Sequence, residues 1–232
     1  MKTITIYHGS ENIVQNPYLL AGKRHNDYGQ GFYCTEDIEL AKEWACKNET
    51  DGFVNMYTLD MSDLKVLNLN SEEYTILNWI AILLQNRIFH LDNDISNMAR
   101  EYIINNFSVD TDEYDVVIGY RADDSYFSFA ESFVSNALPL RGLNKALYLG
   151  KLGEQVALVS SKAFERLSFM DAVPIDGKIY YPKFQARDLS ARKNYRNEVV
   201  HSKRLLDDVF VLDIIRQEMK NDDPRIQRIV SE

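Results

Sequence analysis

Alternating hydrophobic and polar residues mark several segments of the chain as β-strands. The first, TITIY at residues 3–7, alternates strictly and ends at His8-Gly9-Ser10. Residues 114–120 (YDVVIGY) are more continuously apolar, which is typical of a buried strand. The same reasoning predicts further strands at residues 53–60, 64–69, 155–160 and 166–173.

Helical periodicity replaces this alternation elsewhere. We expect Thr35 to cap a helix whose first turn carries Glu36 and Asp37. The apolar residues of that helix fall on one face: Leu40, Ala41, Trp44 and Ala45. Further helices are expected twice within residues 71–106, at 125–138, at 140–150 and between about 185 and 220, with Pro224 marking a short tail. Residues 11–32 contain Asn-Pro and three glycines, which predicts a loop.

The order of these elements indicates the fold class. Strands and helices are mixed irregularly instead of alternating, which favours an α+β fold. A Gly-rich loop does not open a helix directly after the first strand, so a Rossmann or P-loop interpretation fails at its first requirement. The sequence contains neither internal repeats nor a linker long enough to separate two domains.

The charge balance argues against one class of partner. The formal net charge of −9 excludes a general nucleic-acid binder, which would present a basic face. Residues 183–204 are locally basic, with seven Lys and Arg against two acidic residues. We interpret this segment as a solvated helix face.

Cysteine content and the N-terminal sequence bear on the compartment. Cys34 and Cys46 form neither a disulfide framework nor a metal-type Cys/His spacing, so we expect no metal and a reducing, cytoplasmic environment. The N-terminus lacks the apolar run of a signal peptide. No uninterrupted apolar stretch reaches the ~18 residues of a membrane span, so no membrane association is expected.

Four short stretches, taken in order, suggest a function. They are Tyr7-His8-Gly9-Ser10, Tyr28-Gly29-Gln30-Gly31-Phe32-Tyr33 followed by a helix with Trp44, Tyr120-Arg121-Ala122-Asp123-Asp124-Ser125-Tyr126-Phe127, and Glu154-Gln155-Val156 at the start of a strand. Together they resemble the ADP-ribosyltransferase superfamily, in its diphtheria-toxin and poly(ADP-ribose) polymerase branch with a His-Tyr-Glu triad. The chain is most similar to a bacterial family of unknown function within that superfamily, over most of residues 3–173.

The resemblance implies a fold, a substrate and a set of site residues. The fold would be a split β-sandwich with inserted helices at residues 1–180 and a C-terminal helical extension at 181–232. The substrate would be NAD, whose adenosine ribose would be held by His8. Tyr33 and Trp44 would stack on the nicotinamide ring. The remaining implied contacts come from Gly9 on the carboxamide, from Ser10, Tyr28 and Gly31 of the two motifs, and from Glu154 or Gln155 on the nicotinamide ribose.

Physical chemistry agrees with this arrangement. Cleavage of the bond between ribose and nicotinamide passes through an oxocarbenium-like state, so positioning and electrostatics matter more than a protein nucleophile. Gly9 lacks a Cβ and therefore permits close approach to its backbone. Arg121 has two interpretations: contact with a pyrophosphate, with Asp123 near an acceptor, or an ion pair with Asp123 before a helix capped by Asp124 or Ser125.

Two positions depart from the superfamily pattern. Ala41 replaces the serine that would bind the carboxamide. Gln155 stands where a glutamate is expected, with Glu154 beside it, and in a strand only one of these two side chains can face the site. We favour Gln155. Because a glutamine cannot usefully accept a proton, it favours transfer of a single ADP-ribose unit, or a weak or absent activity.

We therefore predict a mono-ADP-ribosyltransferase that acts on an unidentified acceptor. An enzyme of this kind could act as a toxin inside the producing cell and would then need a neutralising antitoxin protein. The alternative is a non-catalytic module that binds NAD or ADP-ribose in the same site. A third interpretation is an RNA-processing nuclease, because Arg196 and His201 match an Arg-x4-His signature. Too few helical residues follow position 185 for that helical fold, and we prefer a solvated basic helix.

Overall fold

The computed structural model describes residues 2–122, 124–149, 153–201 and 205–231. The chain divides into two compact units that are interleaved in the sequence. The first unit comprises Met1–Asn68, Asp110–Arg121 and Leu152–Arg187, and the second comprises Leu69–Val109, Ala122–Lys151 and Asp188–Glu232. The division falls within the long helix α7 (Gly177–His201), which also runs through the boundary that we expected at residue 180.

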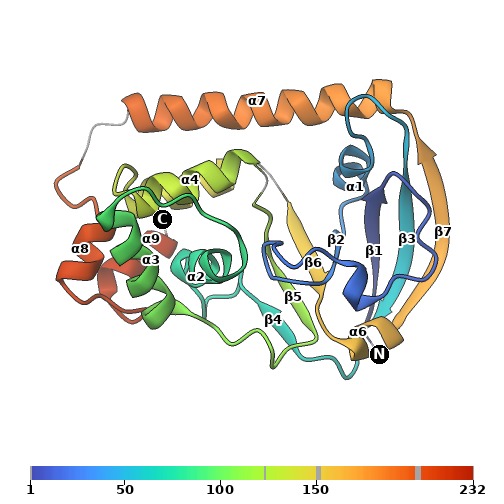
Figure 1. Cartoon of the computed structure of the whole chain (residues 1–232), viewed down its shortest axis with the longest axis horizontal. Helices are drawn as coiled ribbons and strands as arrows, with labels where there is room; N and C mark the ends of the chain where they lie inside the picture. The colour runs from blue at the N-terminus through green and yellow to red at the C-terminus, as the bar shows by residue number, and fades with distance from the viewer. Residues whose placement is uncertain (1, 123, 150–152, 202–204, 232) are drawn as a thin grey trace. The chain divides into compact units, whose positions relative to one another are not determined.

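The first unit contains two β-sheets (Figure 1). One sheet is antiparallel and has the order β1-β3-β7, formed by β1 (Thr3–Ser10), β3 (Gly52–Asp60) and β7 (Leu167–Ile175). The other has the order β2-β6-β5-β4, formed by β2 (Phe32–Cys34), β6 (Glu154–Leu158), β5 (Val116–Tyr120) and β4 (Val66–Asn68). Only the pair β4–β5 is parallel among these strands. The prediction of an α+β protein is confirmed.

The two sheets are joined at one backbone bridge. Tyr7 N donates to Thr35 O at 2.8 Å, and Thr35 N donates to Tyr7 O at 3.0 Å. Behind the bridge lies a hydrophobic core that includes Ile6, Phe32, Tyr57, Leu59, Val156 and Leu158. Ile6 and His8 point to the same face of β1, because alternate residues of a strand share a face. Ile6 is fully buried in this core, whereas His8 is half-buried, with its ring beside the core residue Phe32.

Helix α1 (Ile38–Ala45) packs closely against β1 and β3. A Cβ added to Gly9 would lie 2.1 Å from the Ala41 carbonyl oxygen, so only glycine allows this approach. Ala41 and Ala45 are fully buried there. Our prediction that Thr35 caps this helix is wrong. The N-cap is Asp37, whose carboxylate accepts from the Glu39 and Leu40 amides, while Thr35 Oγ1 accepts from the Asp37 amide.

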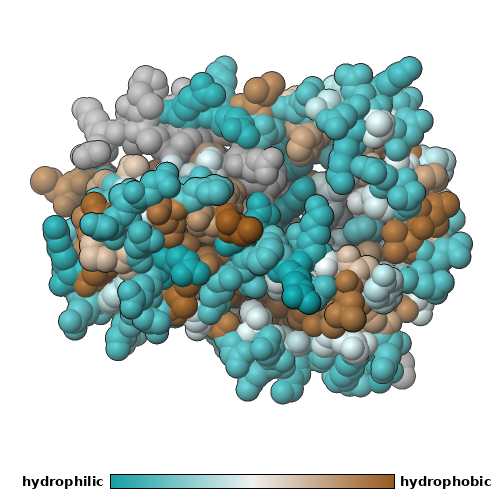
Figure 2. All heavy atoms as spheres, in the orientation of Figure 1, coloured by the Kyte–Doolittle hydropathy of each residue, from teal (hydrophilic) through white to brown (hydrophobic). Residues whose placement is uncertain are grey.

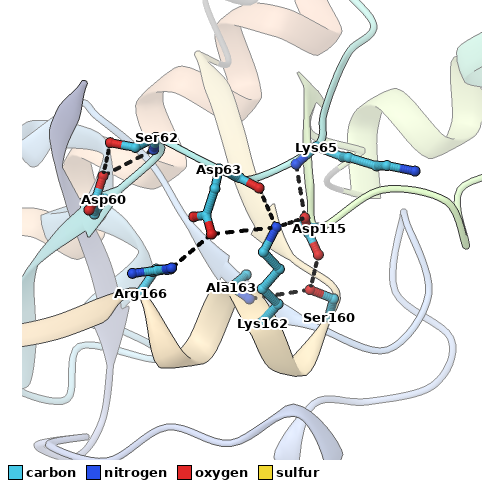
Figure 3. Close-up of polar contacts among 9 residues, drawn as sticks. All are labelled: Asp60, Ser62, Asp63, Lys65, Asp115, Ser160, Lys162, Ala163 and Arg166. Carbon is cyan, nitrogen blue, oxygen red and sulfur yellow. Dashed lines mark hydrogen bonds and ion pairs between the residues drawn. The ribbon is translucent and has the colours of Figure 1, made fainter. Parts of the chain in front are cut away.

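A cluster of charged side chains fixes the beginning of β5 (Figure 3). Asp115 accepts from Ser160 Oγ at 2.6 Å and from the Lys65 amide at 2.8 Å. Ser160 also caps α6 (Ser161–Glu165), from which Lys162 approaches Asp115 to 3.7 Å. Arg166 donates to Asp63 at 2.7 Å. We call this set of residues (Asp63, Lys65, Asp115, Ser160, Lys162 and Arg166) the ionic cluster.

Helices form most of the second unit. They are α2 (Ile76–Asn86), α3 (Asp94–Phe107), α4 (Asp124–Val134), α5 (Leu140–Leu149), α8 (Val211–Arg216), α9 (Pro224–Ser231) and the rest of α7. Helix α2 is buried almost all round, including Trp79. Asn78 on this helix donates to the Phe107 carbonyl at 2.8 Å, which satisfies a polar group that would otherwise be costly to bury.

Several element boundaries differ from the predictions. Strand β1 includes His8, Gly9 and Ser10, where we expected the strand of residues 3–7 to end, because Gly9 and Ser10 pair with Val54 and Phe53 of β3. Strand β2 and helix α6 are too short to show a periodicity and were not predicted. The loop at 11–32 is confirmed up to Gly31, apart from the 3-10 turn η1 (Leu19–Ala21). Pro224 begins a helix instead of a tail, at the first helical position that proline favours.

The surface view in Figure 2 shows hydrophilic side chains over much of the visible face, with smaller hydrophobic areas between them. Across the residues described, we find no helix that combines the length and apolar character required to cross a bilayer.

Candidate functional site

All ten site residues predicted from the sequence belong to the first unit. They are His8, Gly9, Ser10, Tyr28, Gly31, Tyr33, Trp44, Arg121, Glu154 and Gln155. They come from β1, from β2 and the turn before it, from α1, from the residue that follows β5 and from the start of β6.

His8 is tied to the second sheet by its ring. Its Nδ1 lies 2.7 Å from the Tyr33 carbonyl oxygen, and its ring centroid lies 4.4 Å from that of Phe32. A carbonyl can only accept, so Nδ1 carries the proton and Nε2 of the neutral ring is an acceptor. Burial lowers the pKa of His8 below its usual value, the hydrogen bond to Tyr33 opposes this shift, and the charge of Lys47 adds to it. His8 is therefore neutral at pH 7.

The turn before β2 holds the phenol of Tyr33 by its backbone. Tyr33 Oη donates to the Gly29 carbonyl at 2.7 Å and accepts from the Tyr28 amide at 3.0 Å. Gly29 has φ of 78°, a conformation that glycine adopts at low cost. The rings of Tyr28 and Tyr33 are nearly parallel, at 10°, with centroids 6.4 Å apart. Tyr33 itself stays half-buried, with its ring orientation set by the turn.

Glu154 and Gln155 point to opposite faces of β6, as expected for a strand. Glu154 is exposed, whereas Gln155 is 3% exposed. Gln155 Nε2 donates to Asp27 Oδ2 at 2.9 Å and to the Tyr120 carbonyl at 3.0 Å. The same Tyr120 carbonyl accepts from Tyr28 Oη at 2.6 Å.

These contacts join the residues in one series, in which the hydrogen bonds are connected through the covalent frames of Tyr28 and Tyr33. It runs from Gln155 to the Tyr120 carbonyl, on to the hydroxyl and then the amide of Tyr28, next to Tyr33, and finally to His8. The three positions that the sequence suggested as a triad are thus linked through Tyr28, although they are far apart in the sequence.

Trp44 stands next to a cation. The Arg121 guanidinium lies over its ring, 4.5 Å from the centroid, within the range of a cation–π interaction. Trp44 Nε1 is buried and has no acceptor among the residues that the structure describes. A buried N–H of this kind calls for a partner. Asp123, the predicted partner of Arg121, lies outside the described residues, as do the side chains of Asp124 and Ser125.

The remaining predicted positions have local structural partners. Ser10 Oγ donates to the Asn12 carbonyl at 2.6 Å and accepts from Asn55 Nδ2 at 3.0 Å. Gly31 is buried directly before β2. Ala41, where a serine was expected, is fully buried against Gly9.

Two residues at this site were not predicted from the sequence. Asn55 is fully buried on β3, where it accepts from the Val14 amide at 2.7 Å and donates to the His8 carbonyl at 3.2 Å. A polar residue inside an apolar strand was the available signal. Asp27, 5% exposed, precedes Tyr28 and accepts from Gln155. An acidic residue in a polar loop carries no such signal.

The two residues of the nuclease interpretation belong to the second unit. Arg196 is exposed on α7, and the side chain of His201 is outside the described residues. Among the side chains that are described, no three His, Cys, Asp or Glu residues gather where they could hold a metal ion.

The chain is thus an α+β protein whose first unit brings the predicted polar and aromatic residues together on two small sheets and helix α1. The chain belongs to the family described as protein of unknown function (DUF3990), whose model matches residues 4–169. The match includes all ten predicted site residues. Comparison with curated proteins and with solved structures gives no match.

Proposed function

We propose that this protein is an NAD-dependent mono-ADP-ribosyltransferase with a split β-sandwich core. The observation that carries the proposal is the chain of hydrogen bonds that joins His8, Tyr33 and Gln155. The division of the first unit into sheets of three and four strands supports the fold.

The chemistry of His8 suits a ribose. Its protonated Nδ1 is engaged by the Tyr33 carbonyl, so Nε2 is the acceptor that a ribose hydroxyl requires. Because the carbonyl belongs to Tyr33, the same contact places the imidazole relative to the aromatic ring that would stack on nicotinamide. Positioning of this kind contributes directly to a reaction that passes through an oxocarbenium-like state.

Trp44 and Arg121 supply groups that an anionic dinucleotide would satisfy. The buried Trp44 Nε1 donor can receive an acceptor from the ligand, and the adjacent Arg121 guanidinium matches a pyrophosphate. Gly9 contributes through its backbone. Tyr7 directs its amide and carbonyl to Thr35, and backbone groups alternate along a strand, so Gly9 directs its own to the same side of β1. There they could bind the carboxamide.

Purified protein and labelled NAD test this proposal directly. NAD should raise the melting temperature, and the enzyme should release nicotinamide and transfer label to a component of a bacterial lysate. His8→Ala should abolish the thermal shift, whereas His90→Ala, at an exposed histidine of the second unit, should retain it. If the wild-type protein binds NAD but neither releases nicotinamide nor transfers label, the enzymatic function is excluded.

That last outcome would favour a second function, a non-catalytic module that binds NAD or ADP-ribose. One observation favours it: the side chain that faces inward on β6 is Gln155, and its neutral amide does not take up a proton as a glutamate would. The module and the enzyme would share the same ligand contacts.

The setting of the proposed activity rests on the resemblance alone. The acceptor of ADP-ribose, action as a toxin inside a cytoplasm, and a neutralising antitoxin protein are parts of the proposal. A tagged His8→Ala variant expressed in the native host and purified with the proteins bound to it would identify such a partner. Growth arrest on expression of the wild type, absent with His8→Ala, would support the toxin.

A further inference from the structure

The side-chain amide of Gln155 has only one orientation that its surroundings accept. Its Nε2 lies 2.9 Å from Asp27 Oδ2 and 3.0 Å from the Tyr120 carbonyl oxygen. The amide nitrogen has two hydrogens, and these two acceptors use both of them. A flipped amide would place Oε1 against two oxygens, so the assignment of N and O is determined by the contacts.

This orientation leaves Oε1 as the only polar atom of the amide that can meet a ligand. None of the residues that the structure describes donates a hydrogen bond to it. A carbonyl oxygen only accepts, so its ligand partner must be an O–H or N–H group. In this respect the held glutamine resembles an ionised glutamate, which also only accepts, but without a negative charge.

We propose that Asp27 is a positioning residue that commits Gln155 to accept a hydrogen bond from a hydroxyl of the nicotinamide ribose. This inference rests on the proposed binding of NAD and goes beyond it, because the resemblance assigns no role to Asp27. Asp27 and Tyr28 are neighbours in the chain. The Asp27 carboxylate accepts from Gln155 Nε2, and Tyr28 Oη donates to the Tyr120 carbonyl, which also accepts from Gln155.

Loss of the Asp27 carboxylate would free one of the two hydrogens of Nε2. The amide could then rotate and present its NH2 group to the ligand, where a ribose hydroxyl that needs an acceptor would lose its partner. Asparagine at position 27 can still offer an oxygen to Nε2 and should therefore preserve the orientation.

The test is a double-mutant cycle on NAD affinity, measured by isothermal titration calorimetry on the full chain. Asp27→Ala should weaken NAD binding about 10-fold, the scale of one hydrogen bond to a buried polar group. Asp27→Asn should restore most of the affinity. In a Gln155→Ala background, Asp27→Ala should have little further effect, because the group through which it acts is gone. Equal losses in both backgrounds would overturn the positioning role.

A second ligand separates this role from general damage to the fold. An NAD analogue that lacks the 2′-hydroxyl of the nicotinamide ribose, or the 3′-hydroxyl, removes the donor that Gln155 is proposed to meet. Asp27→Ala should leave the affinity for one of these two analogues unchanged relative to wild type. If it weakens NAD and both analogues alike, Asp27 is structural only.

The proposed function can fail separately from this inference. If wild-type protein shows neither heat of binding nor a thermal shift with NAD, the proposed function is refuted and the ligand contact with it. If the wild type binds NAD but the cycle is additive, the function stands and the role of Asp27 falls.

Discussion

The paired strands β5 and β6 end in two polar clusters of opposite character. At the end where Val116 faces Leu158, the ionic cluster contains full charges, and the side chains of Lys162 and Arg166 are 43% and 44% exposed. At the other end, where Tyr120 faces Glu154, the Gln155 amide and the Asp27 carboxylate are nearly inaccessible. Charge on an exposed surface is screened by water, whereas a buried polar group depends on each partner.

The two ends also differ in what they leave open. Both oxygens of Asp115 accept from protein groups, so the ionic cluster closes on itself and holds α6 and β4 against β5. The Gln155 end uses its donors internally, and the acceptor Oε1, which receives no hydrogen bond from the described residues, is the atom that we propose for a ligand. We infer that the first end is structural and the second functional, and four changes test this contrast.

Gln155→Glu should have the largest effect. A second carboxylate would then face Asp27 Oδ2 and the Tyr120 carbonyl, with no hydrogen to donate, and should cost about 3 kcal/mol of unfolding free energy at pH 7. The loss should shrink as the pH falls from about 6 toward about 4, because burial beside Asp27 raises the pKa of the new carboxyl group, which regains a donor when it protonates. Urea denaturation followed by circular dichroism measures both values. The exposed Glu154→Gln is the control, and equal stability of Gln155→Glu and wild type at pH 7 would contradict the contact.

Asp115→Ala should lower the unfolding free energy by about 2 kcal/mol, because the Lys65 amide and the Ser160 hydroxyl lose a buried acceptor. NAD affinity should not change. Although burial raises the pKa of Asp115, hydrogen bonds from Ser160 and Lys65 and the charge of Lys162 lower it overall below its usual value.

The sign of this shift predicts an acid-dependent difference. A carboxyl group with a lowered pKa stabilises the folded state above its unfolded pKa of 3.8, and this stability is lost as the pH falls through the lower folded value. The difference in unfolding free energy between wild type and Asp115→Ala, measured by urea denaturation, should therefore decrease below about pH 4. A gap that stays constant down to pH 2.5 would argue against the shift, and reduced NAD affinity would argue against a purely structural cluster.

Tyr28→Phe should have a smaller effect on the unfolding free energy and should also weaken NAD binding. It removes the hydroxyl that donates to the Tyr120 carbonyl at 2.6 Å but keeps the ring, so we expect a loss of about 1 kcal/mol. NAD affinity should fall severalfold, because the link between Gln155 and Tyr33 is broken. Tyr18→Phe, at a side chain that is 64% exposed, is the matched control and should behave as wild type. Unchanged affinity in Tyr28→Phe would show that the hydrogen-bonded chain is not needed for binding.

The pH dependence contributed by His8 should be the smallest effect. Its pKa is lowered in the folded state, so the unfolded chain binds more protons as the pH falls below about 6.5, and stability decreases from there toward pH 5. NAD affinity should decrease only at lower pH, as the pH falls through the lowered pKa of folded His8, because protonation of Nε2 removes the acceptor. Urea midpoints between pH 7.5 and 5 should show a flatter slope in His8→Gln than in His90→Gln. Identical slopes would contradict the lowered pKa.

Local sequence patterns predicted much of this fold because they depend on neighbouring residues only. The alternation around Ile6 located β1, and the opposite directions of Glu154 and Gln155 followed from strand geometry. The error at Thr35 arose because Asp37 is an equally good cap two residues later, and only the start of α1 distinguishes them. His8 and Tyr33 were also singled out from the sequence, through the resemblance of their motifs to a known superfamily.

The sequence by itself thus determined the α+β class, most strands and helices, and ten of the residues at the candidate site, but not Asp27 or Asn55. Tertiary structure alone decided their partners. Asp27 and Gln155 are separated by 128 residues, and no periodicity relates them. Their contact depends on the register of β5 and β6 and on the turn before β2. The close packing of α1, which requires glycine at position 9, likewise depends on tertiary structure. Hydrogen bonds between distant segments form only once the sheets place them, and these bonds give Gln155 its orientation.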